Sequence, residues 1–163
     1  MATSSDPSAA SRAPAEAILR RASSADLPTL ASIHRRAFFA AMPQMPVLHT
    51  PAEDVVFYSA TVFPRCEIWV AEINGDTIGF ISNRADWIDH LYILPEYQKR
   101  GIGSALLGIP KQTNRSLRLW TFQCNSGARR FYERHGFRIE RETDGRDNDE
   151  RQPDVLYVWR RDE

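Results

Sequence analysis

Residues 91–105 read LYILPEYQKRGIGSA and contain three successive patterns. An apolar run ends at Pro95, a turn rich in cations and glycine follows, and the residues after it begin a helix. The first turn of a helix leaves backbone N–H groups without partners and carries a partial positive charge, so it attracts anions. Glycine at positions 101 and 103 lets a phosphate approach the backbone closely. The stretch therefore predicts a site for a phosphorylated ligand.

Two widespread phosphate-binding patterns do not fit this stretch. A P-loop requires Gly, four residues and then Gly-Lys-Ser or Gly-Lys-Thr, which the stretch lacks. The dinucleotide fingerprint requires a third glycine three residues after Gly103, and that position is Leu106. What remains is Gln98-x-x-Gly101-x-Gly103 directly after a strand. This pattern resembles the pyrophosphate-binding motif of the GNAT superfamily of acyl-coenzyme A-dependent N-acyltransferases.

A second segment, residues 117–139, reads LRLWTFQCNSGARRFYERHGFRI and supports the same resemblance. It predicts a strand, a turn at Asn125, a helix that ends before Gly136, and the start of another strand. The pattern Asn-x-x-Ala-x-x-Phe-Tyr-Glu-x-x-Gly-Phe begins at Asn125 and includes Tyr132. It resembles the second half of the acyl-coenzyme A site of GNAT proteins. The two motifs occur in the order of the family and at its usual separation.

Strand and helix patterns alternate along the rest of the chain. The order of these patterns is that of the GNAT fold. The resemblance therefore implies an α/β (α+β) domain with a mixed twisted sheet of about seven strands, flanked by about four helices, whose fourth and fifth strands splay apart. Strands are expected at residues 17–22, 66–73, 77–83, 87–94, 117–123 and 155–160 and from residue 137, and helices at 26–39, 51–61 and 127–134 and from residue 102.

The domain is expected to span residues 17–163. Residues 1–16 are rich in Ala, Ser and Pro and have no apolar run, so they are expected to form a disordered tail rather than a secretion signal. Within the third helix, Pro110 lacks the N–H of a helical residue. This helix is therefore expected to be short or to kink near Ile109.

Composition excludes several classes of function. The 163 residues suffice for one domain with a substantial core. The 21 basic and 21 acidic residues give zero formal net charge, which argues against general binding of nucleic acids. No apolar run approaches the roughly 20 residues that a membrane helix needs. Cys66 and Cys124 have no His or Cys neighbours at metal spacing, so we expect reduced thiols in a cytoplasmic protein and no metal site.

The resemblance implies acetyl-coenzyme A as the cofactor. Its pantetheine arm is expected to pair with the free edge of the fourth strand, and a backbone N–H near Tyr92 or Ile93 is expected to stabilise the oxyanion. Asn125 is expected to contact the arm, unless it is only a turn residue. The backbone amides at Gly101 and Gly103 are expected to contact the phosphates. Lys99 and Arg100 are expected to pair with the phosphates as well, unless they are only exposed loop residues. The whole set expected at the cofactor is Leu91, Tyr92, Ile93, Gln98, Lys99, Arg100, Gly101, Ile102, Gly103, Ser104 and Asn125.

Tyr132 and Asp89 are the expected catalytic residues. The resemblance implies that Tyr132 lies near the sulfur of the cofactor, where its phenol can protonate the leaving thiolate. The alternative is that Tyr132 is an ordinary core aromatic. Asp89 stands where similar polyamine and aminoglycoside acetyltransferases have a glutamate that handles the proton of the amine. The shorter aspartate acts through water, attracts a cation, or is only a surface charge.

Strand alternation bears on the position of Asp89. It would place Asp89 on the same face as Leu91 and Ile93, where an unpaired buried carboxylate is costly. Either a bulge redirects the side chain or the side chain lines the substrate cleft. His49 and His90 are alternatives for the same role because histidine titrates in the useful range.

These features predict an N-acetyltransferase that moves an acetyl group from acetyl-coenzyme A to a primary amine by direct attack in a ternary complex. The acceptor is expected to lie against residues 38–58 and 143–154; the second segment is acidic enough to attract a cationic amine, unless it is only a solvated loop. A small-molecule amine is favoured because the chain has no basic or extended interaction region. A protein N-terminus or lysine as acceptor, a non-catalytic acyl-coenzyme A-binding module, and a homodimer remain open.

Overall fold

The computed structural model of the protein describes residues 16–162. The tail expected at residues 1–16 lies outside the described residues, apart from Glu16. Seven strands form one mixed sheet in which all neighbours are antiparallel except β4 and β5. The order across the sheet is β1 (Ile18–Arg21), β2 (Glu67–Ile73), β3 (Asp76–Arg84), β4 (Trp87–Ile93), β5 (Ser116–Phe122), β7 (Asp154–Arg160) and β6 (Arg138–Thr143).

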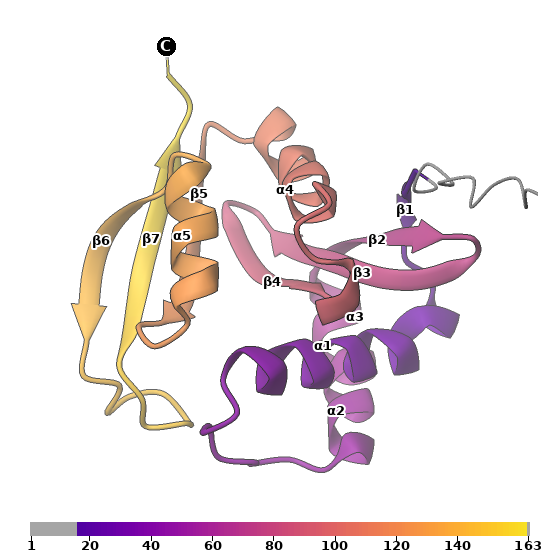
Figure 1. Ribbon diagram of the computed structural model, residues 1–163, viewed down its shortest axis with the longest axis horizontal. Coiled ribbons are helices and arrows are strands. Elements are labelled where there is room, and N and C mark those ends of the chain that lie inside the picture. The colour runs from indigo at the N-terminus through magenta and orange to yellow at the C-terminus, as the bar shows by residue number, and fades with distance from the viewer. Residues whose placement is uncertain (1–15, 163) are drawn as a thin grey trace, which may run out of the picture.

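Helices cover this sheet on both faces, as the sequence predicted. In Figure 1, α5 lies in front of β5 and β7, and α4 lies next to it in front of the N-terminal half of the sheet. The four expected helices are α1 (Leu27–Ala41), α2 (Pro51–Phe57), α4 (Ile102–Thr113) and α5 (Ser126–Arg134). Short helical turns are η1 (Ser24–Asp26), η2 (Tyr58–Val62), α3 (Phe63–Arg65) and η3 (Pro95–Tyr97).

The first two helices begin and pack as their sequences dictate. In α1, the side chains of Leu27, Leu30 and Ile33 recur at helical spacing and are buried against the sheet. At the start of α2, the Thr50 hydroxyl accepts a hydrogen bond from the N–H of Glu53 at 3.2 Å, and the Glu53 carboxylate accepts one from the N–H of Thr50 at 2.7 Å. This confirms the capping box predicted for α2 and holds the helix at the edge of the site.

Pro110 does not end α4, so of the two expected outcomes, a short or a kinked helix, an end near Ile109 is wrong. The helix continues to Thr113. A proline in the last turn removes only one intrahelical hydrogen bond, and its ring is buried in the protein. The carbonyl of Pro110 then accepts from both the backbone N–H and the side-chain amide of Asn114, at 3.1 and 2.9 Å. These two bonds close the helix end one turn later than expected.

The core is one cluster of apolar side chains between the sheet and its helices. Its largest fully buried members are Tyr58, Phe80, Phe137 and Tyr157. Burying a side chain of this size stabilises the fold by about 1.5–3 kcal/mol. Both buried tyrosines satisfy their hydroxyls: Tyr58 bonds to His34 at 2.7 Å, and Tyr157 donates to a glutamate on α5 at 2.7 Å.

The sheet opens between β4 and β5. These parallel strands share one residue pair, Trp87 with Arg118, and one hydrogen bond just before it, from the N–H of Arg118 to the carbonyl of Asp86 at 2.8 Å. Beyond Trp87 the two strands separate. This confirms the predicted splay and leaves the later part of β4 with an unpaired edge.

A bulge interrupts β4 at Asp89. Ser82 of β3 lies opposite His90, and Asn83 lies opposite Ile88, so Asp89 has no partner across the ladder. A bulge of this kind redirects one side chain relative to strict alternation. It resolves the conflict that the sequence posed, because Asp89 need not share the face of Leu91.

Candidate active site

The loop after β4 ends in an exposed helix N-terminus. Gly101 precedes α4 with φ of 80°, a left-handed conformation that a side chain would strain. Lys99, two residues earlier, also has a positive φ of 62°. No side chain caps the helix, and the first N–H that bonds back along the chain belongs to Ala105. The N–H groups of the first turn are therefore available to an anion, as predicted.

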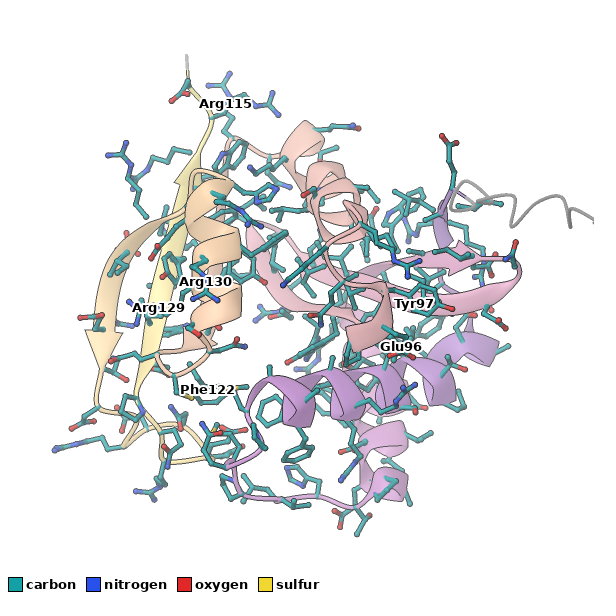
Figure 2. The ribbon with its side chains drawn as sticks, in the orientation of Figure 1. Glu96, Tyr97, Arg115, Phe122, Arg129 and Arg130 are labelled. Carbon is teal, nitrogen blue, oxygen red and sulfur yellow. The ribbon has the colours of Figure 1, made fainter. Side chains whose placement is uncertain are left out.

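Several side chains of this loop hold the loop itself. Gln98 donates to the carbonyl of Ile93 at 3.0 Å and so ties the loop to the end of β4. The guanidinium of Arg100 lies over the ring of Tyr97, 5.2 Å from its centroid, and donates to the carbonyl of Glu96 at 3.2 Å. Figure 2 shows Glu96 and Tyr97 beside this loop. These contacts are intramolecular, so Gln98 and Arg100 have a structural role that the motif did not reveal.

Gly103 has a second reason to be glycine. A Cβ at this position would lie 3.3 Å from two ring atoms of Phe131 on α5. Next to this contact, the hydroxyl of Ser104 is hydrogen-bonded to the imidazole of His135 at 2.8 Å. The two helices that carry the sequence motifs therefore meet directly at the phosphate loop.

The backbone of β4 directs alternate residues into the opening. The N–H of Leu94 donates to Ile78 of β3 at 2.9 Å. Because successive residues of a strand point their polar groups to opposite sides, Ile93 and Leu91 point theirs toward β5, whereas Tyr92 points its own toward β3. Leu91 and Ile93 are thus the residues whose amides face the opening, and Tyr92 contributes its side chain instead.

Tyr132 lies buried on the inner side of α5. Its ring packs edge-on against Phe131 and Phe137, with centroid distances of 5.3 and 5.5 Å. Burial raises the pKa of its phenol well above the ordinary value, with a smaller contribution from Tyr92. Within residues 16–162 its hydroxyl has no hydrogen-bond partner. The hydroxyl is therefore protonated at neutral pH and free to donate.

Asn125 caps α5 with its side-chain oxygen, which accepts from the N–H of Ala128 at 3.2 Å. This is the local role that a turn asparagine was expected to have. Asn125 also lines a cavity, so its amide nitrogen can still meet a ligand.

Asp89 faces a cavity with one oxygen occupied and one free. Its Oδ2 accepts from the guanidinium of Arg84 at 2.9 Å and from the thiol of Cys66 at 3.4 Å. Its Oδ1 has no hydrogen bond to any residue in the described range. Asp89 is thus half held by the protein and half available to a ligand or to water.

An aromatic cluster with two imidazoles lies beside Asp89. His34 stacks on Tyr92 at 4.2 Å, and His90 lies 5.4 Å from His34. Burial lowers the pKa of His34 to about 4 and that of His90 to about 3, with a further small effect on His90 from His34. The role of His34 was missed in the sequence because its spacing is that of a polar residue in a helix. His49, the other expected alternative, lies exposed near Glu53 at 3.7 Å.

Two cavities adjoin at the end of β4. One has a volume of about 520 Å³ and lies between α1, β5 and the loop before β7, and the other has about 380 Å³ and lies between α1, α2 and β4. Phe38, Tyr92 and Phe122 line both. The two segments expected to hold the acceptor, residues 38–58 and 143–154, thus border the same space. Five carboxylates and one guanidinium line the smaller cavity.

Comparison with known proteins identifies the family. The family model described as "Acetyltransferase (GNAT) domain" matches residues 64–139. Uncharacterized N-acetyltransferase MJ1530 of Methanocaldococcus jannaschii is 33% identical over 131 residues, which cover 74% of this chain and 78% of that protein. The chain belongs to the GNAT acetyltransferase family. This confirms the family that the two sequence motifs predicted.

Other relatives match the GNAT chain over a shorter region. Uncharacterized N-acetyltransferase YafP of Escherichia coli is 41% identical over 73 residues, 45% of this chain and 47% of that protein. Peptidyl-lysine N-acetyltransferase YiaC of Escherichia coli is 35% identical over 72 residues, 44% of this chain and 49% of that protein. The matched regions of these two relatives span about half of their length.

Solved structures share the GNAT fold. Apo-form YjaB from Escherichia coli superposes with a TM-score of 0.74 at 20% identity, covering 88% of this chain and 97% of that chain. YncA from Salmonella typhimurium, solved with its cofactor acetyl-CoA, superposes with a TM-score of 0.68 at 17% identity, covering 91% of this chain and 96% of that chain.

None of the helices within residues 16–162 is long and apolar enough to cross a membrane. No group of three or more His, Cys, Asp or Glu side chains in that range could hold a metal ion.

Proposed function

We propose that the protein transfers an acetyl group from acetyl-coenzyme A to a primary amine of a small molecule. One observation supports this most: β4 and β5 separate beyond Trp87, the uncapped start of α4 follows one end of β4, and Tyr92 of β4 lines an acidic cavity. An extended cofactor that is anionic at one end and reactive at the other fits along this strand edge. Family membership and the acetyl-CoA held by a protein of the same fold agree with it.

In this proposal the cofactor supplies the missing strand contacts. Its diphosphate lies against the first-turn amides of α4, with Lys99 nearby as an exposed cation. Its pantetheine amides pair with the polar groups of Leu91 and Ile93, and the amide of one of them stabilises the oxyanion. The thioester then lies close to Tyr132 and to the cavities.

During the transfer the substrate nitrogen loses two protons. The ammonium first loses one proton. Asp89 Oδ1 receives this proton directly or through water and passes it on to solvent. The neutral nitrogen forms a bond to the thioester carbon, and the C–S bond breaks. Tyr132 gives its proton to the departing sulfur and regains one from the nitrogen. The products are an acetamide, free coenzyme A and one proton.

A protein lysine is the second candidate acceptor. The relative YiaC is named a peptidyl-lysine N-acetyltransferase, and a lysine side chain is also a primary amine that an acidic cavity attracts. We favour a small molecule because the chain has no basic or extended interaction region. The free thiols of Cys66 and Cys124 fit a reducing compartment such as the cytoplasm.

Thermal unfolding and thiol release test the proposal together. Acetyl-coenzyme A at 100 times its dissociation constant should stabilise the fold by about 2.7 kcal/mol through mass action, whereas NAD and ATP should leave the melting temperature unchanged. A panel of amines should then give acceptor-dependent release of free coenzyme A. Equal protection by all three nucleotides contradicts the cofactor assignment, and protection without transfer to any amine would indicate a binding module.

A further inference from the structure

The smaller cavity has walls made mainly of aromatic rings. Phe38 and Phe39 come from α1, Phe57 from α2, and Phe122 from the end of β5. Figure 2 shows Phe122 in the space between the C-terminal strands and α1. Aromatic surfaces favour apolar bodies and cations and leave hydroxyl groups without partners. The walls therefore suit a compact apolar group more than a sugar or a polyhydroxylated ring.

The two buried histidines add uncharged surface to the same walls. His34 uses its Nδ1 with the hydroxyl of Tyr58, and His90 uses its own with the hydroxyl of Ser82, both at 2.7 Å. Burial lowers both pKa values far below 7, so neither ring is positively charged at neutral pH. A cationic ligand in the cavity therefore meets no repulsion from either imidazole.

The five carboxylates of this cavity differ in whether another residue pairs with them. Asp149 and Glu150, in the loop before β7, line the cavity and have no ion pair or hydrogen bond with residues of the described range. Glu150 is half-buried, and its charge helps to raise the pKa of Tyr92. The other three carboxylates are held: Asp54 by Arg35 at 2.7 Å, Asp89 by Arg84 at 2.9 Å, and Glu53 by the N–H of Thr50 at 2.7 Å.

We propose that the acceptor is a monoamine with an aromatic or alkyl body, whose ammonium is recognised by Glu150 and Asp149 and whose body packs among Phe38, Phe57 and Phe122. This rests on the proposed acetyl transfer. The cavity of about 380 Å³ holds a ligand of that size. A second ammonium at the far end of the ligand would be desolvated against aromatic rings, a cost that an alkyl or aromatic end avoids.

The carboxylates and the aromatic walls have opposite effects on the protonation of the reacting amine. A carboxylate near the amine favours its charged form, whereas apolar walls favour its neutral form. Glu150 therefore captures the ammonium at the mouth, and the aromatic walls promote loss of its proton as the nitrogen moves toward Tyr92. A polyamine gains from the capture by Glu150 but not from the proton loss that the aromatic walls promote.

Matched acceptors test this inference with the full chain. Hexylamine and cadaverine differ in that a terminal methyl replaces a second ammonium, and phenethylamine adds a ring. The kcat/KM for hexylamine and phenethylamine should exceed that for cadaverine, kanamycin and a lysine peptide by about 10–100-fold. A higher kcat/KM for cadaverine, kanamycin or the peptide overturns the inference while leaving acetyl transfer intact.

Two variants locate the recognition. Glu150→Gln should lower kcat/KM for phenethylamine by about tenfold, whereas Glu140→Gln, an exposed change on β6 outside both cavities, should leave it within about twofold. Phe57→Ala should lower kcat/KM for phenethylamine about tenfold more than it lowers kcat/KM for methylamine, which has no body to contact the ring. Phe57 is 43% exposed, so the variant should fold, and thermal unfolding checks this.

Three results contradict the inference in separable ways. If Glu150→Gln behaves like Glu140→Gln, Glu150 does not recognise the ammonium. If acetyl-coenzyme A stabilises the protein but neither hexylamine nor phenethylamine is acetylated, the acceptor class is wrong. If acetyl-coenzyme A neither stabilises the protein nor reacts with any amine, the proposed function fails and the inference fails with it.

Discussion

Two tyrosines near α5 differ in what their hydroxyls do. Tyr157 donates to Glu133 at 2.7 Å and receives a hydrogen bond from Arg129 at 3.2 Å, so its hydroxyl is part of the structure. The hydroxyl of Tyr132 has no such partner within the described chain, although its ring is buried. A hydroxyl without a protein partner adds no hydrogen bond to the fold. In the proposed function, the Tyr132 hydroxyl therefore remains available as a proton donor.

The variant Tyr132→Phe separates these roles. It should lower kcat by about a hundredfold, because it removes the proton donor to the thiolate, and leave the dissociation constant of coenzyme A unchanged. Steady-state rates and calorimetry measure the two quantities. The matched control Tyr157→Phe should keep kcat and lose about 1 kcal/mol of stability. Unchanged turnover in Tyr132→Phe would remove this residue from the mechanism.

The sequence could single out Tyr132 as a candidate but not the surroundings of His34. Tyr132 sits inside a local motif of thirteen residues, so neighbouring positions support its assignment. His34 acquires its surroundings from Tyr58, His90 and Tyr92, which are distant in the chain and meet it only after the helices pack on the sheet. A lone histidine in a helix carries no local signal of such contacts.

Helices α4 and α5 form one unit around the phosphate loop. They touch where Gly103 meets Phe131, and the ammonium of Lys111 donates to the carbonyl of His135 at 2.6 Å near the other end. The loop conformation thus depends on both helices. A change in either helix at this contact should reach the cofactor site.

Two glycines of α4 allow this to be tested. Gly103→Val should lower both stability and affinity for coenzyme A, because the new side chain displaces the ring of Phe131 and crowds the first-turn amides. Gly108→Ala should raise stability by about 0.5–1 kcal/mol without changing affinity, since a Cβ there meets no atom within 4 Å. Denaturant unfolding and calorimetry give the two values.

The outcome for Gly103→Val decides between two uses of the residue. Lower stability with unchanged affinity would mean that this glycine serves only the contact between the helices. The assignment of the loop to a phosphate would then be wrong.

At this scale the sequence predicted the order and type of the elements but not their irregularities. Pro110 was expected to interrupt α4, yet the side chain and backbone of Asn114 close the helix one turn later. Alternation left open whether a bulge redirects Asp89 or Asp89 lines the cleft, and the structure shows both a bulge there and Asp89 in the lining of the smaller cavity. Both features depend on tertiary pairing, which local periodicity does not contain.

Over the whole molecule, the candidate site is assembled from distant parts of the chain. The two cavities join α1 and α2 to β4, β5 and the loop before β7. The sequence predicted two segments for the acceptor, and both border these cavities. It could not predict that aromatic rings and carboxylates line the same cavity, because residues more than a hundred positions apart, such as Phe38 and Asp149, meet there.

The buried imidazoles make global stability depend on pH. Unfolded histidine has a pKa of about 6.5, whereas burial lowers that of His34 to about 4 and that of His90 to about 3. Between these values the unfolded chain binds more protons than the folded chain. Their contribution to stability is therefore complete above about pH 6.5 and is lost as the pH falls toward 4.

Denaturant unfolding between pH 5 and 6 measures this effect before carboxylates titrate. As the pH is lowered, the free energy of unfolding should fall by roughly 2 kcal/mol per pH unit for the two histidines together. The fall is smaller to the extent that water in the cavity screens their charge. His90→Gln should halve the slope. A free energy that stays flat across this range would show that both imidazoles titrate normally in the folded protein.

The two halves of the sheet are joined at Trp87 and Arg118 and nowhere further along β4 and β5. Strands β1 to β4 with α1 and α2 lie on one side of this junction, and β5 to β7 with α5 lie on the other, while α4 contacts both sides. In the proposed function, a pantetheine arm between β4 and β5 would add a further connection between the two sides of the sheet.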